Sequence, residues 1–444
     1  MVKRGAERED GPSVKRRGGS FNRFSEEMLL TIFSYLDVRE LINCHSVCRR
    51  WYRISSDNSL WRKLYYSRFG DDDKDYESEK DVTLKWKGRF RIQYNWHCGS
   101  GRLQTVQLST VQKRHETMAC CGRVIFRITE GPELVIVDVA GTLLSTVPLR
   151  PIMGSLQYDS QAKLITASES NDEYTICVAF SDGSALALQW NGRGGRVGTV
   201  HPICTTNRAN PITAVTCRWP LVAFMTSNRR VSVIDIESKR QVYSAFGTQI
   251  PPTHNASLKI DPSPVAGMAH CLSIVYYKQL LCRDWAICVD EVHLSTNYSS
   301  SSTRSASCVG FSAPATTLPT CYEPPYVVTG NPDNTMGCYL VQSTRSNLSI
   351  VPHVQLWGHL NGVGQVKVRQ SGRAVSVASN GHEILWWDLS KAKAANGIPV
   401  KSRQQRSRFS HSQKAGTLLH FDDTFLVREL IRDRSHLLEL YGFD

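Results

Sequence analysis

The 444-residue sequence lacks any apolar run approaching the ~20 residues that span a bilayer, and its N-terminus is charged rather than apolar. These two absences argue against a transmembrane helix and a secretory signal, so we expect a soluble protein with no membrane partner. The 14 cysteines include no Cys-x-x-Cys pair, and neither Cys44 with Cys48 nor Cys120 with Cys121 has further ligands at zinc spacing. We therefore expect reduced, buried thiols, no bound metal and no cofactor.

Motifs of catalysis are missing as well. The sequence has no Gly-x-x-x-x-Gly-Lys phosphate loop, no His-Glu-x-x-His pair and no Gly-x-Ser-x-Gly elbow. The glycine-rich stretch 192–196 follows a strand pattern and opens no helix, so it is typical of a connecting loop. We expect a protein without catalytic residues of its own.

The excess of positive charge is concentrated in two segments. The formal net charge is +13, of which residues 1–23 contribute +4 and residues 391–408 contribute +6. The remaining chain is nearly neutral, which argues against a general nucleic-acid-binding surface. Residues 391–408 could be an import signal or a nucleic-acid contact, although a solvated loop is the commoner reading of such a run.

Residues 1–23 are rich in glycine, serine and charge, and we expect this basic tail to be disordered. It holds two basic clusters ten residues apart, a pattern typical of a bipartite nuclear localisation signal. The candidate residues are Lys3, Arg4, Lys15, Arg16 and Arg17. The alternative is a merely solvated tail, so the expected location is nuclear, cytoplasmic or both.

Residues 24–66 predict a small module of three helices. Ser25 can cap the first helix, Asp37 and Glu40 form a capping box before the second, and Asp57 or Asn58 precedes the third. Between these caps lie more large apolar side chains than about forty residues can bury. The excess apolar face predicts a protein partner.

This segment resembles an F-box. The resemblance rests on Phe24–Asp37, followed by Val47–Trp51 and Ser59–Trp61 in order and at family spacing, with Ser25 where the family usually has proline. It implies docking onto the Skp-type adaptor of an SCF ubiquitin ligase and, through the adaptor, association with cullin and RING subunits. The implied adaptor-binding residues are Phe24, Ser25, Leu29, Leu30, Ile32, Phe33, Leu36, Leu41, Val47, Cys48 and Trp51. A helical hairpin that packs only on its own chain is the alternative.

Residues 67–100 form a linker in this interpretation. An acidic run at 71–81 is typical of a solvated loop, and the stretch 84–94 mixes aromatic and basic side chains. Asn95, Trp96 and Gly99 resemble the Asn-Trp-x-x-Gly element that joins F-box and propeller in F-box/WD-repeat proteins. Packing against the neighbouring domains is therefore favoured over a grip on single-stranded nucleic acid.

Residues 101–444 change to short alternating strands separated by turns. A recurring hairpin ends at intervals of 45–55 residues, at Asp138, Trp190, Asp235, Asp290, Leu340, Asp388 and Tyr441. WD-type blades repeat every ~40–45 residues and kelch-type blades every ~50. The fold class is therefore predicted as a three-helix F-box followed by an all-β propeller of seven blades, with Leu103–Leu108 as the outer strand that closes the ring.

Most of the repeats lack a complete WD signature. Only one copy is whole, with Gly358 and His359 followed by Trp387 and Asp388, and the turn 370–373 lacks the usual aspartate. Two insertions interrupt the period. The segment 295–308, which includes the serine-rich run 298–307, is expected to be a flexible loop and kinase substrate, and the other insertion is 391–414.

The resemblance implies a non-catalytic receptor subunit of an SCF-type E3 ubiquitin ligase, whose propeller binds the protein to be ubiquitylated. Many propellers of the family read phosphorylated motifs through arginines on one face, so the substrate could be phosphorylated. Two alternatives remain at this point. The first is an interaction scaffold unrelated to ubiquitin, and the second is a propeller enzyme such as a hydrolase. The sequence alone assigns no substrate-binding residues.

Overall fold

The computed structural model describes residues 24–70, 85–110, 117–129, 133–149, 161–195, 197–205, 210–246, 256–280, 285–310, 319–331, 333–390, 398–399, 401–402, 417–432 and 435–443. The chain divides into two compact units, Met1–Arg91 and Ile92–Asp444. Among the helices of the described ranges, none has the length and apolar character needed to cross a membrane.

The first unit is helical. Its helices are α1 (Glu26–Phe33), α2 (Val38–Cys44), α3 (Arg49–Ser55), α4 (Asn58–Phe69) and the first half of α5 (Trp86–His97). The predicted caps are confirmed. Ser25 Oγ accepts a hydrogen bond from the Met28 amide at 3.3 Å, and Asp37 and Glu40 form a reciprocal capping box at 2.8 and 2.9 Å. Asp57 caps α4 by accepting from the Ser59 amide at 2.9 Å.

Two features of this unit differ from the predicted three helices. The predicted second helix is broken into α2 and α3, because Cys48 takes an extended conformation and caps a new helix at Arg49. The second half of the predicted linker contains α5, whose aromatic and basic residues show no clear helical period.

One core holds the module together. Its buried members include Leu29, Phe33 and Leu41, and they pack with the aromatic side chains of α4 and α5. The Trp61 and Phe90 rings meet edge to face with centroids 5.5 Å apart. Such pairs add to the stabilisation that area burial provides.

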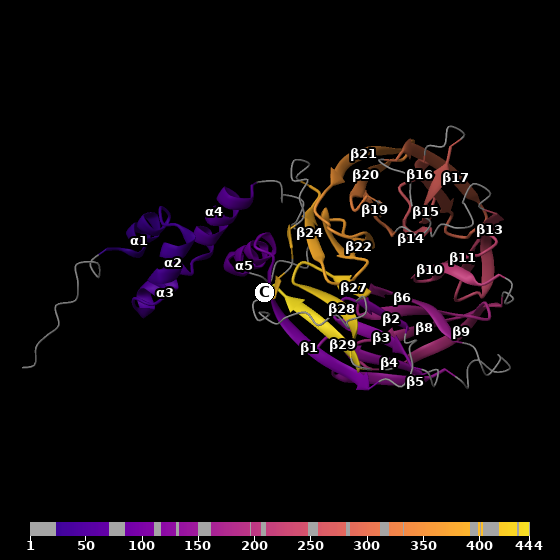
Figure 1. The fold of residues 1–444 in the computed structure, drawn as a ribbon, viewed down its shortest axis with the longest axis horizontal. Helices are drawn as coiled ribbons and strands as arrows, with labels where there is room; N and C mark the ends of the chain where they lie inside the picture. Colours follow the sequence, from indigo (N-terminus) through magenta and orange to yellow (C-terminus); the bar gives the residue numbers. More distant parts are fainter. Residues whose placement is uncertain are drawn as a thin grey trace, which may run out of the picture. The chain divides into compact units, whose positions relative to one another are not determined.

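The second unit is a ring of seven antiparallel sheets, or blades (Figure 1). Six of them follow one another along the chain, each with four strands in sequence order. Their strands are β2 (Thr117–Cys121), β3 (Val124–Ile128), β4 (Glu133–Asp138) and β5 (Leu143–Pro148); β6 (Ala162–Ser170), β7 (Glu173–Phe180), β8 (Ser184–Asn191) and β9 (Val197–Thr205); β10 (Ile212–Arg218), β11 (Leu221–Thr226), β12 (Arg230–Asp235) and β13 (Arg240–Phe246); β14 (Ser257–Pro262), β15 (His270–Gln279), β16 (Trp285–Leu294) and β17 (Ser301–Val309); β18 (Thr320–Glu323), β19 (Tyr326–Gly330), β20 (Met336–Ser343) and β21 (Leu348–Leu356); β22 (Val363–Val368), β23 (Arg373–Ala378), β24 (Ile384–Asp388) and β25 (Ile398–Pro399).

The seventh blade joins the two ends of the propeller. It consists of β27 (Thr417–Phe421), β28 (Phe425–Arg432) and β29 (Ser435–Gly442), with β1 (Ser100–Thr110) as the next strand outward. The short β26 (Lys401–Ser402) pairs in parallel with the start of β1. Leu103 lies opposite Tyr441 in the antiparallel β1–β29 ladder, so the predicted closing strand is confirmed.

The predicted seven-bladed propeller is confirmed, and the repeat spacing has a simple structural meaning. Each of the seven predicted strand ends lies in the third strand of its blade, namely β4, β8, β12, β16, β20, β24 or β29. Third strands are largely buried and follow a turn, which makes them recognisable in sequence as apolar segments after turn residues.

The first strands of adjacent blades line the ring and are joined by side chains. Arg218 on β10 forms an ion pair with Asp261 on β14 at 3.0 Å, and Lys259 on β14 forms one with Glu323 on β18 at 2.6 Å. Lys367 on β22 donates to a β27 carbonyl at 2.7 Å. These contacts link blades that share no backbone ladder.

The Asn-Trp-x-x-Gly element belongs to the propeller. The Asn95 side-chain amide donates to the Phe443 carbonyl at 2.7 Å, and the Trp96 indole donates to the Asp423 carbonyl at 2.6 Å while its ring stacks on the Phe443 ring. Gly99 has a φ of +59°, a left-handed conformation suited to glycine that turns the chain out of α5 into β1.

Replacing Phe443 with alanine should destabilise the propeller, because its fully buried ring fills the space beside Trp96. We expect Phe443→Ala to lower the free energy of unfolding by about 3–5 kcal/mol, measured by urea denaturation followed by tryptophan fluorescence. Phe246→Ala is the matched control, because that ring is exposed, and it should change stability by less than about 0.5 kcal/mol. Equal losses in both variants would contradict this role for Phe443.

Candidate functional site

The eleven adaptor-binding residues predicted from sequence do not share one surface. Leu29, Phe33 and Leu41 are buried in the core of the module. Phe24, Leu30, Leu36 and Trp51 are half-buried, whereas Ser25, Ile32, Val47 and Cys48 are exposed. Leu29, Phe33 and Leu41 contribute to the core of this unit, and the assignment of the eleven residues to adaptor binding stays a prediction.

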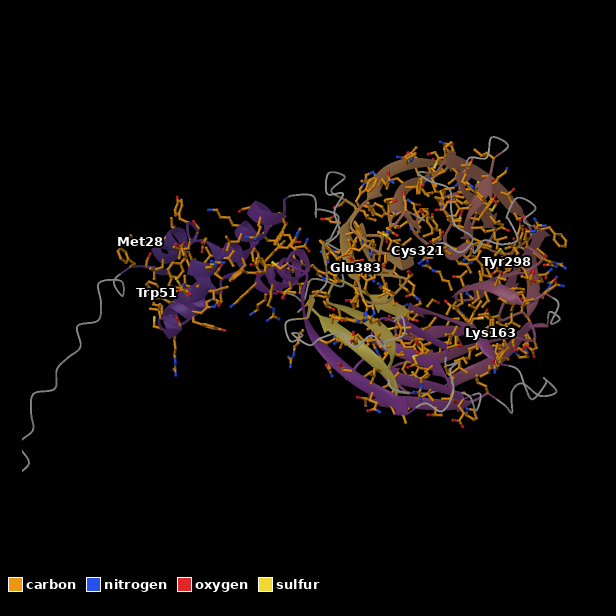
Figure 2. The ribbon with its side chains drawn as sticks, in the orientation of Figure 1. Met28, Trp51, Lys163, Tyr298, Cys321 and Glu383 are labelled. Carbon is orange, nitrogen blue, oxygen red and sulfur yellow. The ribbon has the colours of Figure 1, made fainter. Side chains whose placement is uncertain are left out.

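Helix α1 and the turn after it carry apolar side chains at both buried and exposed positions. Leu29 and Phe33, four residues apart, are buried in the core, whereas Met28 and Ile32, also four residues apart, are exposed, and so is Tyr35 just after the helix. Figure 2 labels Met28 on α1 and Trp51 on α3. Tyr35 is 82% exposed, which is unusual for an aromatic side chain unless it contacts a partner.

Further large apolar side chains are exposed on the same module. We call the full set the outer set: Met28, Ile32, Tyr35, Ile42, Val47 and Tyr52. Four of its members, Met28, Tyr35, Ile42 and Tyr52, are absent from the sequence prediction. Separating the 28/32 series from the 29/33 series on α1 would have revealed Met28.

One blade of the propeller carries a complete hydrogen-bond chain built from its WD signature. His359 lies before β22, and its Nδ1–H donates to Glu383 Oε2 at 2.9 Å. Its Nε2 accepts from the Ser376 hydroxyl at 2.6 Å, and Ser376 Oγ in turn accepts from the Trp387 indole at 2.8 Å. Burial lowers the pKa of His359, so its ring is neutral and can donate at one nitrogen and accept at the other.

The carboxylate of this hydrogen-bond chain does not come from the turn 370–373. The turn 370–373 has no aspartate, as noted above, but Glu383 in the β23–β24 connection supplies the acceptor instead. Arg373, at the end of the turn 370–373, is buried and forms an ion pair with Asp423 at 2.6 Å.

The β23–β24 connection and the β21–β22 connection emerge on the same face of the ring. In an antiparallel blade, the turn between the second and third strands and the link to the next blade lie at the same strand ends. Trp357 is 50% exposed and Leu360 is 83% exposed in the β21–β22 connection. We call this side of the ring the Trp357 face.

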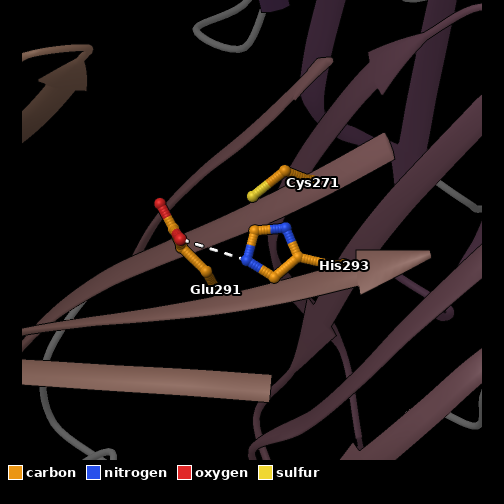
Figure 3. A group of neighbouring side chains, drawn as sticks. All are labelled: Cys271, Glu291 and His293. Atoms are coloured by element: carbon orange, nitrogen blue, oxygen red, sulfur yellow. Dashed lines mark ion pairs between the residues drawn. The ribbon is translucent and has the colours of Figure 1, made fainter. Parts of the chain in front are cut away.

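Cys271, Glu291 and His293 form a buried cluster of side chains of the types that bind zinc (Figure 3). Their ligand atoms lie within 4.8 Å of one another. Burial raises the pKa of the Cys271 thiol to about 12 and lowers the pKa of His293, so both groups are neutral. His293 Nδ1 is 2.9 Å from Ser263 Oγ.

The charge of Glu291 is already balanced. Its Oε2 accepts from Arg304 at 2.6 Å and from the Ser343 hydroxyl at 3.1 Å. Arg304 also donates to the Thr344 carbonyl at 2.8 Å, so it connects two adjacent blades. A cation here would add positive charge beside Arg304, and we assign the cluster to contact between blades.

Several sequence predictions concern other segments. The segment 295–308, predicted as a flexible loop, forms strand β17 from Ser301 onward, and the residues of this strand alternate between exposed and half-buried. The nuclear-localisation candidates Lys3, Arg4, Lys15, Arg16 and Arg17 lie outside the described residues, as does most of 391–408.

A helical module followed by a seven-bladed propeller defines the class of F-box/propeller proteins, and family comparisons agree. The model described as F-box-like matches residues 26–67, and the model described as F-box protein pof12 beta-propeller matches residues 102–415. The second match spans most of the chain. The chain therefore belongs to the F-box protein pof12 beta-propeller family.

Individual relatives match over short stretches. F-box protein dre-1 of Caenorhabditis elegans is 31% identical over 94 residues, which are 21% of this chain and 10% of that protein. F-box/WD repeat-containing protein 4 of Homo sapiens is 32% identical over 85 residues, 19% of this chain and 21% of that protein. The chain thus covers no more than about a fifth of either relative. A solved structure described as "Structure of U3-55K" has a TM-score of 0.44 at 12% identity, covering 76% of this chain and 98% of that chain, which is too weak a likeness to argue from.

Replacing Ser376 should weaken the blade that carries the WD signature. Ser376→Ala leaves the His359 Nε2 and the Trp387 indole N–H buried without the hydroxyl that pairs with both. We expect a loss of about 2–4 kcal/mol in the free energy of unfolding. Ser379→Ala, at an exposed serine in the adjacent turn, should leave stability within about 0.5 kcal/mol of wild type, and an equal effect of both changes would refute this account.

Proposed function

We propose that the chain is a non-catalytic substrate-recognition subunit of an SCF-type ubiquitin ligase. An F-box implies binding to a Skp-type adaptor in general, and the adaptor would recruit cullin and RING subunits. The observation that carries this proposal is the outer set on a module that matches the F-box family model. The names of the relatives, which are F-box proteins, support the same class of role.

The proposed role needs no chemistry from this chain. A receptor accelerates ubiquitin transfer by holding its substrate near the loaded transferase, which raises the effective concentration of the reacting groups. What it needs instead is one surface for the adaptor and one for the substrate. The outer set and the Trp357 face lie in different units of the chain and are proposed for these two tasks.

The physical argument for adaptor docking is the double apolar character of α1. Leu29 and Phe33 belong to the core of the module, whereas Met28, Ile32 and Tyr35 keep a large part of their apolar surface exposed. Burying each of these side chains in a partner would contribute about 1.5–3 kcal/mol of hydrophobic free energy. Ser25 caps α1 directly, so the absent family proline does not prevent this helix from forming.

We expect the double variant Ile32→Asp/Val47→Asp to lose binding to purified Skp-type adaptor by at least 100-fold, because two charges would be buried at the contact. The measurement is isothermal titration calorimetry with the full chain. Both side chains are exposed, so the thermal midpoint of unfolding should stay within about 2 °C of wild type.

The matched control for this experiment is Leu143→Asp, which places the same charge on an exposed apolar position of β5. It should bind the adaptor like wild type. If folded wild-type protein does not bind the adaptor, the ligase role is excluded and an interaction scaffold becomes the better description. Unchanged binding by the double variant would exclude the outer set as the docking surface.

We further propose that the Trp357 face receives the protein substrate. Exposed tryptophan is the residue most enriched among binding hot spots, and Leu360 beside it is almost fully accessible.

In cells that depend on the Trp357→Ala/Leu360→Ala variant, ubiquitylation of the substrates should fall while adaptor binding stays at the wild-type level. Quantitative mass spectrometry of ubiquitin remnants, compared with wild type and with Leu143→Ala, measures this. Unchanged ubiquitylation would place substrate recognition elsewhere, and loss of adaptor binding would show that the variant acts through the fold.

A further inference from the structure

Asparagine followed by glycine is a reactive pair, because glycine has no Cβ to keep its amide nitrogen away from the asparagine side chain. Asparagine is accordingly among the residues that limit the chemical stability of proteins at high temperature. In the described part of the chain, three such pairs occur, which are Asn191–Gly192, Asn361–Gly362 and Asn380–Gly381. Whether each pair reacts depends on how the fold holds the two reacting groups.

The reaction needs only water and a base. The glycine amide nitrogen gives up its proton and forms a bond to the asparagine Cγ, and the side-chain nitrogen leaves as ammonia. Water then opens the resulting succinimide ring by breaking one of its two C–N bonds. Breaking the bond from Cγ yields aspartate. Breaking the bond from the backbone carbonyl yields isoaspartate, in which the main chain runs through Cβ and Cγ and is one atom longer.

The fold protects two of the three pairs. The Gly192 amide donates to the Asp172 carbonyl at 2.9 Å, and the Gly381 amide donates to the Ala378 carbonyl at 2.8 Å. In both pairs the asparagine side-chain oxygen also accepts a hydrogen bond from a backbone amide at 3.0 Å. Both reacting groups are therefore held, and the nitrogen can attack only after the turn has opened locally.

The pair Asn361–Gly362 is held at neither group. Asn361 is exposed, and among the described residues neither its side-chain amide nor the Gly362 backbone amide has a hydrogen-bond partner. The surroundings also leave room for a ring. A Cβ placed on Gly362 would meet no atom nearer than 3.7 Å, whereas one on Gly192 would lie 3.2 Å from the Tyr174 ring. Ring closure at this pair needs no prior opening of the fold.

The residues on either side of Asn361 are fixed to neighbouring turns. The Leu360 amide donates to Glu383 Oε2 at 3.1 Å, and the Leu360 carbonyl accepts from the Asn334 side chain at 3.2 Å. The Gly362 carbonyl accepts from an amide of the β23–β24 connection at 2.7 Å. Figure 2 labels Glu383 at this end of its blade. A change at Asn361 therefore acts directly on the position of Leu360 in the Trp357 face.

We propose that Asn361 is a self-modification site, which deamidates through a succinimide formed with Gly362 and so converts the Trp357 face to an aged form. The aged form carries a carboxylate beside Leu360, where a charge opposes the burial of apolar surface. Its isoaspartate product also lengthens the main chain between two fixed neighbours. The effect on substrate binding rests on the proposed receptor function, whereas the modification itself does not.

The modification is tested by incubating the full chain in mildly alkaline buffer and mapping its peptides by liquid chromatography and mass spectrometry. In the folded chain, Asn361 should deamidate at least tenfold faster than Asn191 and Asn380, because only those two must wait for local opening. In urea-unfolded chain the three rates should converge. Equal rates in the folded chain, or a slower rate at Asn361, would overturn the proposal.

The variant Gly362→Ala keeps Asn361 but hinders the attacking nitrogen, and the structure has room for its Cβ. We expect deamidation of Asn361 to slow by at least tenfold. The matched control is Gly198→Ala, at a glycine that follows no asparagine and also has room for a Cβ, and it should age like wild type. An unchanged rate in Gly362→Ala would show that succinimide formation is not the route.

The consequence for the Trp357 face is tested with Asn361→Asp in the ubiquitin-remnant measurement described above. Substrate ubiquitylation should fall while adaptor binding stays at the wild-type level. Asn347→Asp is the matched control, because this exposed asparagine lies in the β20–β21 turn at the opposite strand ends. If Trp357→Ala/Leu360→Ala lowers ubiquitylation and Asn361→Asp does not, the proposed effect of ageing is wrong. If neither lowers it, the substrate role of the face fails, and the deamidation rates alone decide the modification site.

Discussion

The antiparallel pairing of β1 with β29 is the contact on which the rest of the propeller depends. It supplies the fourth strand of the seventh blade and turns an open row of sheets into a closed ring. Because β1 directly follows Gly99, the same contact fixes the second half of α5, whose Trp96 stacks on the ring of Phe443 just beyond β29. Ring closure and attachment of the helix are therefore one structural event.

The seven blades do not need seven WD signatures. The blade with His359 and Trp387 uses a neutral histidine between a carboxylate and a hydroxyl, whereas the Glu291 cluster joins neighbouring blades through the charge of Arg304. Ion pairs between first strands, such as that of Lys259 with Glu323, provide further links. A degenerate repeat sequence can thus keep one architecture, because different polar contacts satisfy the same need to hold adjacent sheets together.

The fold was predictable where local pattern determines structure. Apolar alternation after a tight turn marked each third strand, and side-chain caps marked the starts of α1, α2 and α4. Contacts between residues that are distant in sequence could not be predicted from local pattern. Glu383 replaces an aspartate from another turn, and Leu29 and Ile32 of α1 are both apolar, yet Leu29 is buried and Ile32 is exposed. The serine-rich β17 lacks the large apolar residues by which strands are usually recognised, so its pattern suggested a loop.

The order of strands in the closing blade has a consequence for how the protein is made. Strands β2 to β25 find their ladder partners within their own blades, but β1 and β29 are more than 300 residues apart in sequence. The first propeller strand to leave the ribosome must therefore remain without its antiparallel partner until the last strand has been synthesised, while that backbone edge stays open to other chains. A translation pause or premature stop before Ser435 would leave six finished sheets in an unclosed arc, a species that chaperones or proteases would have to handle.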